Sequence, residues 1–209
     1  MLDSTQSQRQ QRHVFIVDDD VQTLRAFARI LHVEGFDVDT FHSASDFLKH
    51  PPSHVPSCLL LDLRLPEIDG LQLQQLMRSA HVDLPIIFVS GYGDVPSTAS
   101  AMRYGAVDFL EKPVEGARLL DAVSSAVALD AVRRGRRRDS DNARKLLAEL
   151  TPRERQVCDL VARGLLNKQI ADEIGASERT VKIHRARAIQ KLGITSVTDL
   201  VRLLSRIGE

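Results

Sequence analysis

Two short apolar stretches end in acidic residues whose type and placement suggest chemistry. Asp18, Asp19 and Asp20 follow the stretch VFIV, and Asp62 follows LLL. Carboxylates that are held close together repel one another unless a cation neutralises them. Mg²⁺ suits such a cluster because it prefers oxygen ligands, and a carboxylate can also act as the nucleophile that forms an acyl phosphate. These residues therefore suggest a magnesium-dependent reaction.

Two further polar side chains follow stretches of the same kind. Ser90 follows IIFV, and Lys112 follows DFLE. A hydroxyl and an ammonium group can bind phosphoryl oxygens as charge redistributes during transfer. The combination predicts a phosphoryl-transfer site. The simpler interpretation, that polar residues merely cap strand ends, applies more readily to each residue alone than to all of them together.

Such a site needs a scaffold that brings the ends of separate segments to one edge. Short β-branched or aliphatic runs alternate with helical periodicity through the first half of the chain. This alternation predicts a flavodoxin-like, doubly wound parallel sheet of five strands, with its ligand site at the carboxyl ends of the strands. The predicted strands are His13–Val17, Phe36–Phe41, Cys58–Leu61, Pro85–Val89 and Val107–Leu110.

The net formal charge of zero hides two halves of opposite charge. Residues 11–128 contain 9 Lys/Arg and 16 Asp/Glu, whereas residues 131–209 contain 18 and 10. The basic half is the candidate for nucleic-acid binding. The arginine-rich segment 131–145 is predicted to be a linker, a solvated tether or a helical extension of the preceding segment up to Gly135. It would join domains at 12–130 and 146–209.

The C-terminal half carries start and stop signals for four helices and none for strands. Thr151–Glu154 forms a capping box with proline at the first helical position. Asn167, Ser177 and Ser196 are predicted to cap the next three helices. The glycines predicted to end the first three helices are Gly164, Gly175 and Gly193. The whole chain is thus expected to be α/β plus all-α.

The third of these helices has two different faces. Its predicted inward residues are Val181, His184, Ala188 and Leu192. Its opposite face is basic with an apolar patch, formed by Arg179, Lys182, Ile183, Ala186, Arg187 and Gln190. This face suits a major groove that displays thymine methyl groups, so the pattern favours a helix-turn-helix. A helical bundle with a solvated basic face is the alternative.

Other classes of protein receive no support from the composition. The two cysteines, Cys58 and Cys158, lie in no disulfide or zinc spacing, and their use fits a reducing compartment. We find no apolar run long enough to span a membrane and no secretory signal at the N-terminus. We therefore expect a cytoplasmic protein without membrane contact.

Residues 12–130 resemble the receiver domains of two-component response regulators, through the strings VFIVDDD, LLLDLRLPEIDG, FVSGYGD and AVDFLEKP. The resemblance implies that Asp62 accepts a phosphoryl group that Ser90 and Lys112 help to bind. It implies a Mg²⁺ site formed by Asp18, Asp19, Asp62 and the backbone carbonyl of Arg64. Ser90 and Phe109 would form the conformational switch, and the Lys112–Pro113 bond would be cis. Asp20 more readily caps the first helix.

Residues 146–209 resemble the LuxR-type DNA-binding domain, through the strings LTPRE, NKQIA and TVKIH. Together the two resemblances point to the FixJ/NarL class of response regulators, with the helix-turn-helix at Asn167–Ala186. Lys182, Ile183 and Ala186 resemble base-facing positions, and Arg179, Thr180 and Arg185 resemble backbone-facing ones. Arg187 completes the expected DNA-binding set.

The resemblance implies a transcriptional regulator that a sensor histidine kinase activates by phosphorylation. It would form a homodimer when phosphorylated, bind a double-stranded operator and contact RNA polymerase, with no enzymatic activity beyond limited autophosphotransfer and autodephosphorylation.

Two rivals remain. A haloacid-dehalogenase-like phosphatase would need a second aspartate two residues beyond Asp62, where Arg64 stands. A receiver that has lost phosphorylation would not be expected to keep the site residues.

The lifetime of the phosphorylated state is expected to depend on Arg64 and Tyr92, which flank the phosphoryl group in receivers. Neither is an acid or an amide that would orient water for hydrolysis, which favours a long-lived phosphoaspartate. The alternative is that both side chains point to solvent and that other groups, including the kinase, set the lifetime.

Overall fold

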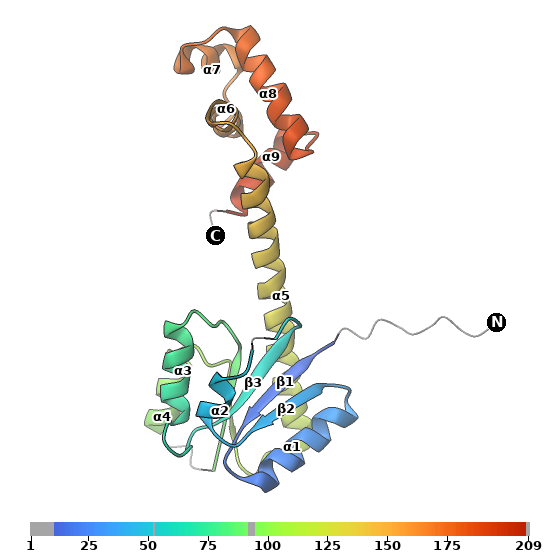
Figure 1. Ribbon diagram of the computed structural model, residues 1–209, viewed down its shortest axis with the longest axis vertical. Helices are drawn as coiled ribbons and strands as arrows, with labels where there is room; N and C mark the ends of the chain where they lie inside the picture. The colour runs from blue at the N-terminus through green and yellow to red at the C-terminus, as the bar shows by residue number, and fades with distance from the viewer. Residues whose placement is uncertain (1–10, 52, 92–94, 208–209) are drawn as a thin grey trace, which may run out of the picture. The chain divides into compact units, whose positions relative to one another are not determined.

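The computed structural model describes residues 11–51, 53–91 and 95–207 (Figure 1), and the side chains of residues 95–97 are not described. The chain divides into two compact units between Arg134 and Gly135, inside the segment expected to be the linker. Among the described residues, no helix is both long and apolar enough to cross a membrane.

The N-terminal unit contains a five-stranded parallel sheet with strand order β2-β1-β3-β4-β5, as expected for a doubly wound fold. The strands are β1 (His13–Val17), β2 (Asp37–Phe41), β3 (Ser57–Asp62), β4 (Ile86–Ser90) and β5 (Asp108–Glu111). All lie within one residue of the predicted bounds. The helices that follow these strands are α1 (Val21–Val33), α2 (Ala44–Leu48), α3 (Gly70–Ser79), α4 (Val95–Arg103) and α5 (Gly116–Ala148).

Two hydrophobic clusters cover the two faces of the sheet. One contains Val14 and Ile16 of β1, together with the buried sides of α1 and α5. The other contains Phe15 and Val17 of the same strand, packed against α2, α3 and α4. Because consecutive strand residues point to opposite faces and both faces are covered, the three inner strands β1, β3 and β4 are almost continuously hydrophobic. Their polar residues are left at the strand ends.

Helix α5 is longer than the sequence indicated. It continues through Gly135 to Ala148, so the residues expected to be a linker are helical. Glycine costs only about 1 kcal/mol in a helix interior, and here it did not end the helix. The apolar residues near the end of α5, Ala143 and Leu147, belong to the core of the C-terminal unit.

The C-terminal unit contains four further helices, α6 (Pro152–Ala162), α7 (Asn167–Ile174), α8 (Glu178–Leu192) and α9 (Val197–Ser205). Thr151, Ser177 and Ser196 cap α6, α8 and α9 as expected. The prediction for α7 was wrong. Its N-cap is Leu166, which provides no side-chain hydrogen bond, and Asn167 is the first helical residue.

Candidate functional site

The carboxyl edge of the sheet brings together three of the predicted site residues. Asp18 directly follows β1, Asp62 ends β3, and Lys112 directly follows β5. Lys112 Nζ lies 2.6 Å from Asp18 Oδ2 and 3.1 Å from Asp62 Oδ1. Both carboxylates are buried, with side chains 2% and 8% exposed. One ammonium group thus serves two buried carboxylates, a pairing that leaves the trio with net negative charge.

Backbone groups hold the other oxygen of each carboxylate. The amide of Asp20 donates to Asp18 Oδ1 at 2.9 Å, and the amide of Arg64 donates to Asp62 Oδ2, also at 2.9 Å. Each bond connects a side chain to the backbone two residues further on, which fixes the carboxylate at the point where the strand turns away. The orientation of both acids is therefore set by local backbone as well as by Lys112.

The surroundings change the acidity of this cluster. Burial raises the pKa of Asp62, and the charge of Asp18 adds to that effect, although Lys112 opposes it. Burial alone would lower the pKa of Lys112, but its bonds and charge interactions with Asp18 and Asp62 outweigh burial and raise that pKa. Lys112 is therefore a stable cation beside a carboxylate of increased basicity.

The neighbouring acids have different positions. Asp19 is exposed, and Asp20 accepts bonds from the amides of Gln22 and Thr23, which makes it the cap of α1 as expected. The bond from Gln22 is the largest of the effects that lower the pKa of Asp20. In the described part of the chain, no three His, Cys, Asp or Glu side chains are arranged to hold a metal ion.

Ser90 and Phe109 lie on β4 and β5, the two strands beyond β3 in the sheet. Ser90 ends β4, is buried, and accepts a backbone hydrogen bond from Lys112 at 2.9 Å. Phe109 on β5 is half-buried, with its ring 6.5 Å from that of Phe88 and inclined by 25°. The Lys112–Pro113 peptide bond is cis. Arg64 is exposed, and Tyr92 lies outside the described residues.

Gly70 is a site residue that the sequence analysis missed. A Cβ atom at this position would lie 2.4 Å from the backbone oxygen of Asp62 and 3.1 Å from the Cα of Leu63. The amide of Gly70 also donates to the oxygen of Leu63 at 3.0 Å. The first turn of α3 therefore packs directly on the backbone that carries Asp62. The signal that could have revealed Gly70 was the Asp69-Gly70 pair, which ends the string LLLDLRLPEIDG.

The basic face of α8 is accessible in the C-terminal unit. The three aliphatic residues predicted to point inward, Val181, Ala188 and Leu192, are buried. The residues predicted on the opposite face are all exposed: Arg179, Lys182, Ile183, Ala186, Arg187 and Gln190. Because the exposed set carries three positive charges and one branched apolar side chain, it can contact phosphates and a thymine methyl group.

Thr180, His184 and Arg185 lie between these two faces. Thr180 Oγ1 is 2.8 Å from the Oγ of Ser177, the residue that caps α8. His184 is half-buried. Arg185 is half-buried as well, and its Nη1 donates to Asn167 Oδ1 at 3.3 Å. Its position four residues after Val181 and three before Ala188 was a signal that it borders the inward face.

Two family models match the chain, and both agree with the fold. The response regulator receiver domain matches residues 14–124, and the luxR family of bacterial regulatory proteins matches residues 148–204.

Similar proteins align with both parts of the chain. The chain is 43% identical to nodulation protein W of Bradyrhizobium diazoefficiens over 93% of this chain and 86% of that protein. It is 37% identical to the transcriptional regulatory protein FixJ of the same species, over 94% and 96%. Among solved structures, response regulator StyR is 42% identical with a TM-score of 0.84, covering 94% of this chain and 99% of that one.

Proposed function

Since this chain belongs to the two-component response regulators of the FixJ/NarL class, which regulate transcription under the control of phosphorylation, we propose that Asp62 is its phosphoacceptor. The observation that best supports this assignment is the buried Asp62 carboxylate with Lys112 Nζ at 3.1 Å. Such a pair combines a nucleophile with a cation that can bind the phosphoryl oxygens.

The proposed reaction transfers a phosphoryl group from a phosphohistidine of a sensor kinase. An oxygen of Asp62 bonds to phosphorus while the phosphorus–nitrogen bond breaks, and the imidazole nitrogen keeps the electron pair. Lys112 and the hydroxyl of Ser90 bind the phosphoryl oxygens. The chain's own chemistry is then limited to autophosphotransfer and autodephosphorylation.

The donor set at this edge fits Mg²⁺. The ion is usually held by one or two carboxylates and keeps several waters, and here Asp18 and Asp62 share a single ammonium group, so a divalent cation would offset the remaining negative charge. Asp18, Asp19, Asp62 and the backbone carbonyl of Arg64 would hold it. When bound, the ion would supply positive charge to the phosphoryl oxygens.

Phosphorylation is proposed to act through Ser90 and Phe109. Ser90 moves towards the phosphoryl group, and Phe109 turns inward behind it. The face formed by α4, β5 and α5 then favours a homodimer. The effect is a shift of population between two states, because the phosphoryl group stabilises one of them. The dimer binds a double-stranded operator and contacts RNA polymerase.

DNA recognition is proposed to use the exposed face of α8. Lys182, Ile183 and Ala186 face base edges in the major groove, whereas Arg179 and Thr180 contact the phosphate backbone and Arg187 adds positive charge. The exposure of Ile183, which is 44%, supports this arrangement because a branched apolar side chain gains nothing from water but can contact a thymine methyl group.

Phosphate incorporation from a small phosphodonor tests the central assignment. With Mg²⁺ present, Asp62→Asn should abolish formation of the acyl phosphate, measured by intact mass. Asp121→Asn, which changes an exposed carboxylate on α5, should leave incorporation unchanged. Incorporation by Asp62→Asn equal to that of the parent would show that the phosphoacceptor lies elsewhere.

A further inference from the structure

Arg185 differs from its charged neighbours on α8. Arg179, Lys182 and Arg187 are exposed, whereas Arg185 is half-buried and donates to Asn167 Oδ1 at 3.3 Å. The bond connects α8 to the first residue of α7, 18 positions earlier in the chain. Arg185 therefore joins the two helices of the helix-turn-helix to each other.

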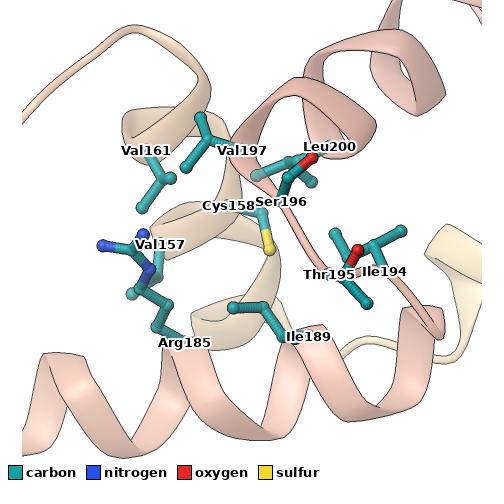
Figure 2. Close-up of a pocket in the computed structure, with 10 residues that line it drawn as sticks. All are labelled: Val157, Cys158, Val161, Arg185, Ile189, Ile194, Thr195, Ser196, Val197 and Leu200. Atoms are coloured by element: carbon teal, nitrogen blue, oxygen red, sulfur yellow. The ribbon is translucent and has the colours of Figure 1, made fainter.

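The rest of the Arg185 side chain is directed into the C-terminal unit. It lines a small hollow of about 50 Å³, together with Val157, Cys158 and Val161 of α6 (Figure 2). Figure 2 shows its guanidinium group on the α6 side of α8. Arginine often packs its aliphatic stem on apolar surface while its charged end reaches a polar partner. Here that partner is Asn167, at the start of α7.

The N-cap of α7 is a poor one, so a contact from outside the helix can add to what holds its first turn. Leu166 occupies the position where Ser, Thr, Asp or Asn usually binds a free amide, and it makes no side-chain cap bond. What holds this end locally is Gln169 Oε1, which accepts a bond from the amide of Leu166 at 2.8 Å. The bond from Arg185 adds a connection from outside the helix.

We propose that Arg185 is a positioning residue, which holds the start of α7 against α8 and so sets the orientation in which α8 presents Lys182 and Ile183 to DNA. The proposal rests on the proposed function in one respect, that α8 reads bases. It replaces the expectation that Arg185 contacts the DNA backbone. The guanidinium that would bind a phosphate already donates from Nη1 to Asn167.

The two roles predict opposite results in DNA binding. Loss of a phosphate contact weakens binding to all sequences and flattens the dependence of log K on log salt by about one unit. Loss of orientation moves the base-reading side chains out of register while all phosphate-binding charges remain. It lowers the preference for the correct sequence and leaves the salt slope unchanged.

The test uses the full-length phosphorylated protein and a duplex selected from random DNA, with a scrambled duplex for comparison. Affinities are measured over a range of salt concentrations at a temperature where circular dichroism shows every variant folded. We expect Arg185→Gln and Asn167→Ala each to reduce the preference for the selected duplex by about tenfold, the effect of losing one good base contact. The salt slope should remain that of the parent.

The double variant shows whether the two residues act as a pair. If they do, combining Arg185→Gln with Asn167→Ala should cost no more than either change alone. Arg202→Gln, an exposed arginine on α9, controls for the loss of a charge and should keep the sequence preference. Arg179→Ala provides the reference for a phosphate contact and should flatten the salt slope.

A flattened slope with unchanged preference for Arg185→Gln would overturn the proposal, as would additive losses in the double variant. If Arg185→Gln does not fold, Asn167→Ala and Arg185→Lys carry the same comparison, with Arg185→Lys expected to retain part of the preference. A parent that binds both duplexes equally would instead contradict base reading by α8, which separates the failure of the proposed function from that of this inference.

Discussion

Glu154 is a buried carboxylate that connects three segments of the C-terminal unit. Its side chain is 4% exposed, and its Oε2 accepts from Lys191 Nζ at 2.7 Å and from the amide of Thr151 at 2.9 Å. Lys191 also donates to the backbone oxygen of Glu149 at 3.1 Å. The bond with Lys191, followed by that with Thr151, lowers the pKa of Glu154 from 4.5 to about 2.

This shift predicts how acid affects the unit. A carboxyl group whose pKa is lower in the folded state stabilises that state at every pH above the pKa that the group has in the unfolded chain. This contribution is lost as the pH falls through the pKa of the folded state. For Glu154 the loss extends from about pH 4.5 to about pH 2. Glu154→Gln should destabilise the unit at neutral pH and make its stability fall less steeply across that range, measured by urea unfolding.

Asp172→Asn, which changes an exposed acid on α7, is the control and should retain the slope of the parent. Parallel pH profiles for the parent and Glu154→Gln would contradict the role given to Glu154.

Some of the contacts between these residues could be predicted from the sequence and others could not. Asp18, Asp62 and Lys112 could be assigned to one edge because the carboxyl ends of parallel strands share that edge. The sharing of one lysine by two acids depends on side-chain rotamers, which a sequence does not display. The bond from Arg185 to Asn167 also depends on side-chain rotamers, so the sequence did not predict it.

Helix α7 gives a direct test of capping. Its N-cap Leu166 has the extended backbone of an ordinary cap, with φ −78° and ψ 155°, and is 71% exposed, so a smaller side chain loses little buried surface. Leu166→Ser should stabilise the C-terminal unit by about 1 kcal/mol, because the hydroxyl can accept a bond from a free amide in the first turn. Thermal unfolding measures the change.

Leu166→Ala provides the comparison, since alanine is also a poor cap. Equal stability of Leu166→Ser and Leu166→Ala would mean that the first turn of α7 has no amide available for a cap.

The ends of helices were harder to predict than their existence. Asn167 seemed a good cap by type, yet the helix starts one residue earlier in the chain, and the Asn167 side chain bonds to Arg185 instead. Gly135 seemed a good stop, yet α5 passes through it, because a single glycine costs a helix interior only about 1 kcal/mol. Residue type alone therefore did not determine either position.

At the scale of the whole molecule, α5 contributes to two hydrophobic clusters, through separate stretches of its sequence. The last residue of this helix in the N-terminal cluster is Val127, and the first in the C-terminal cluster is Ala143. Just beyond Val127, the buried Asp130 accepts bonds from the amide of Ser57 at 2.8 Å and from Arg134 Nε at 2.6 Å. From Gly135 to Asn142 no residue is buried. This part of the helix is therefore packed less than the parts on either side of it.

Local opening should therefore concentrate in that stretch. Segments with few buried contacts open at lower free energy than those packed in a core. Amide hydrogen exchange should be faster by about tenfold or more for residues 135–142 than for residues 119–127 or 143–147 of the same helix. Uniform exchange along α5 would show that the exposed stretch is stabilised by contacts of another kind.

The arrangement of α5 also affects how such a protein can change over evolutionary time. A recombination event between related genes within the codons for residues 135–142 would divide no hydrophobic cluster, because every cluster member along α5 lies before or after them. Each parent would contribute a complete core, and the product would need only helix-compatible residues at the junction. The least buried part of the helix is thus the place where the receiver domain of one regulator can be joined to the luxR-family domain of another.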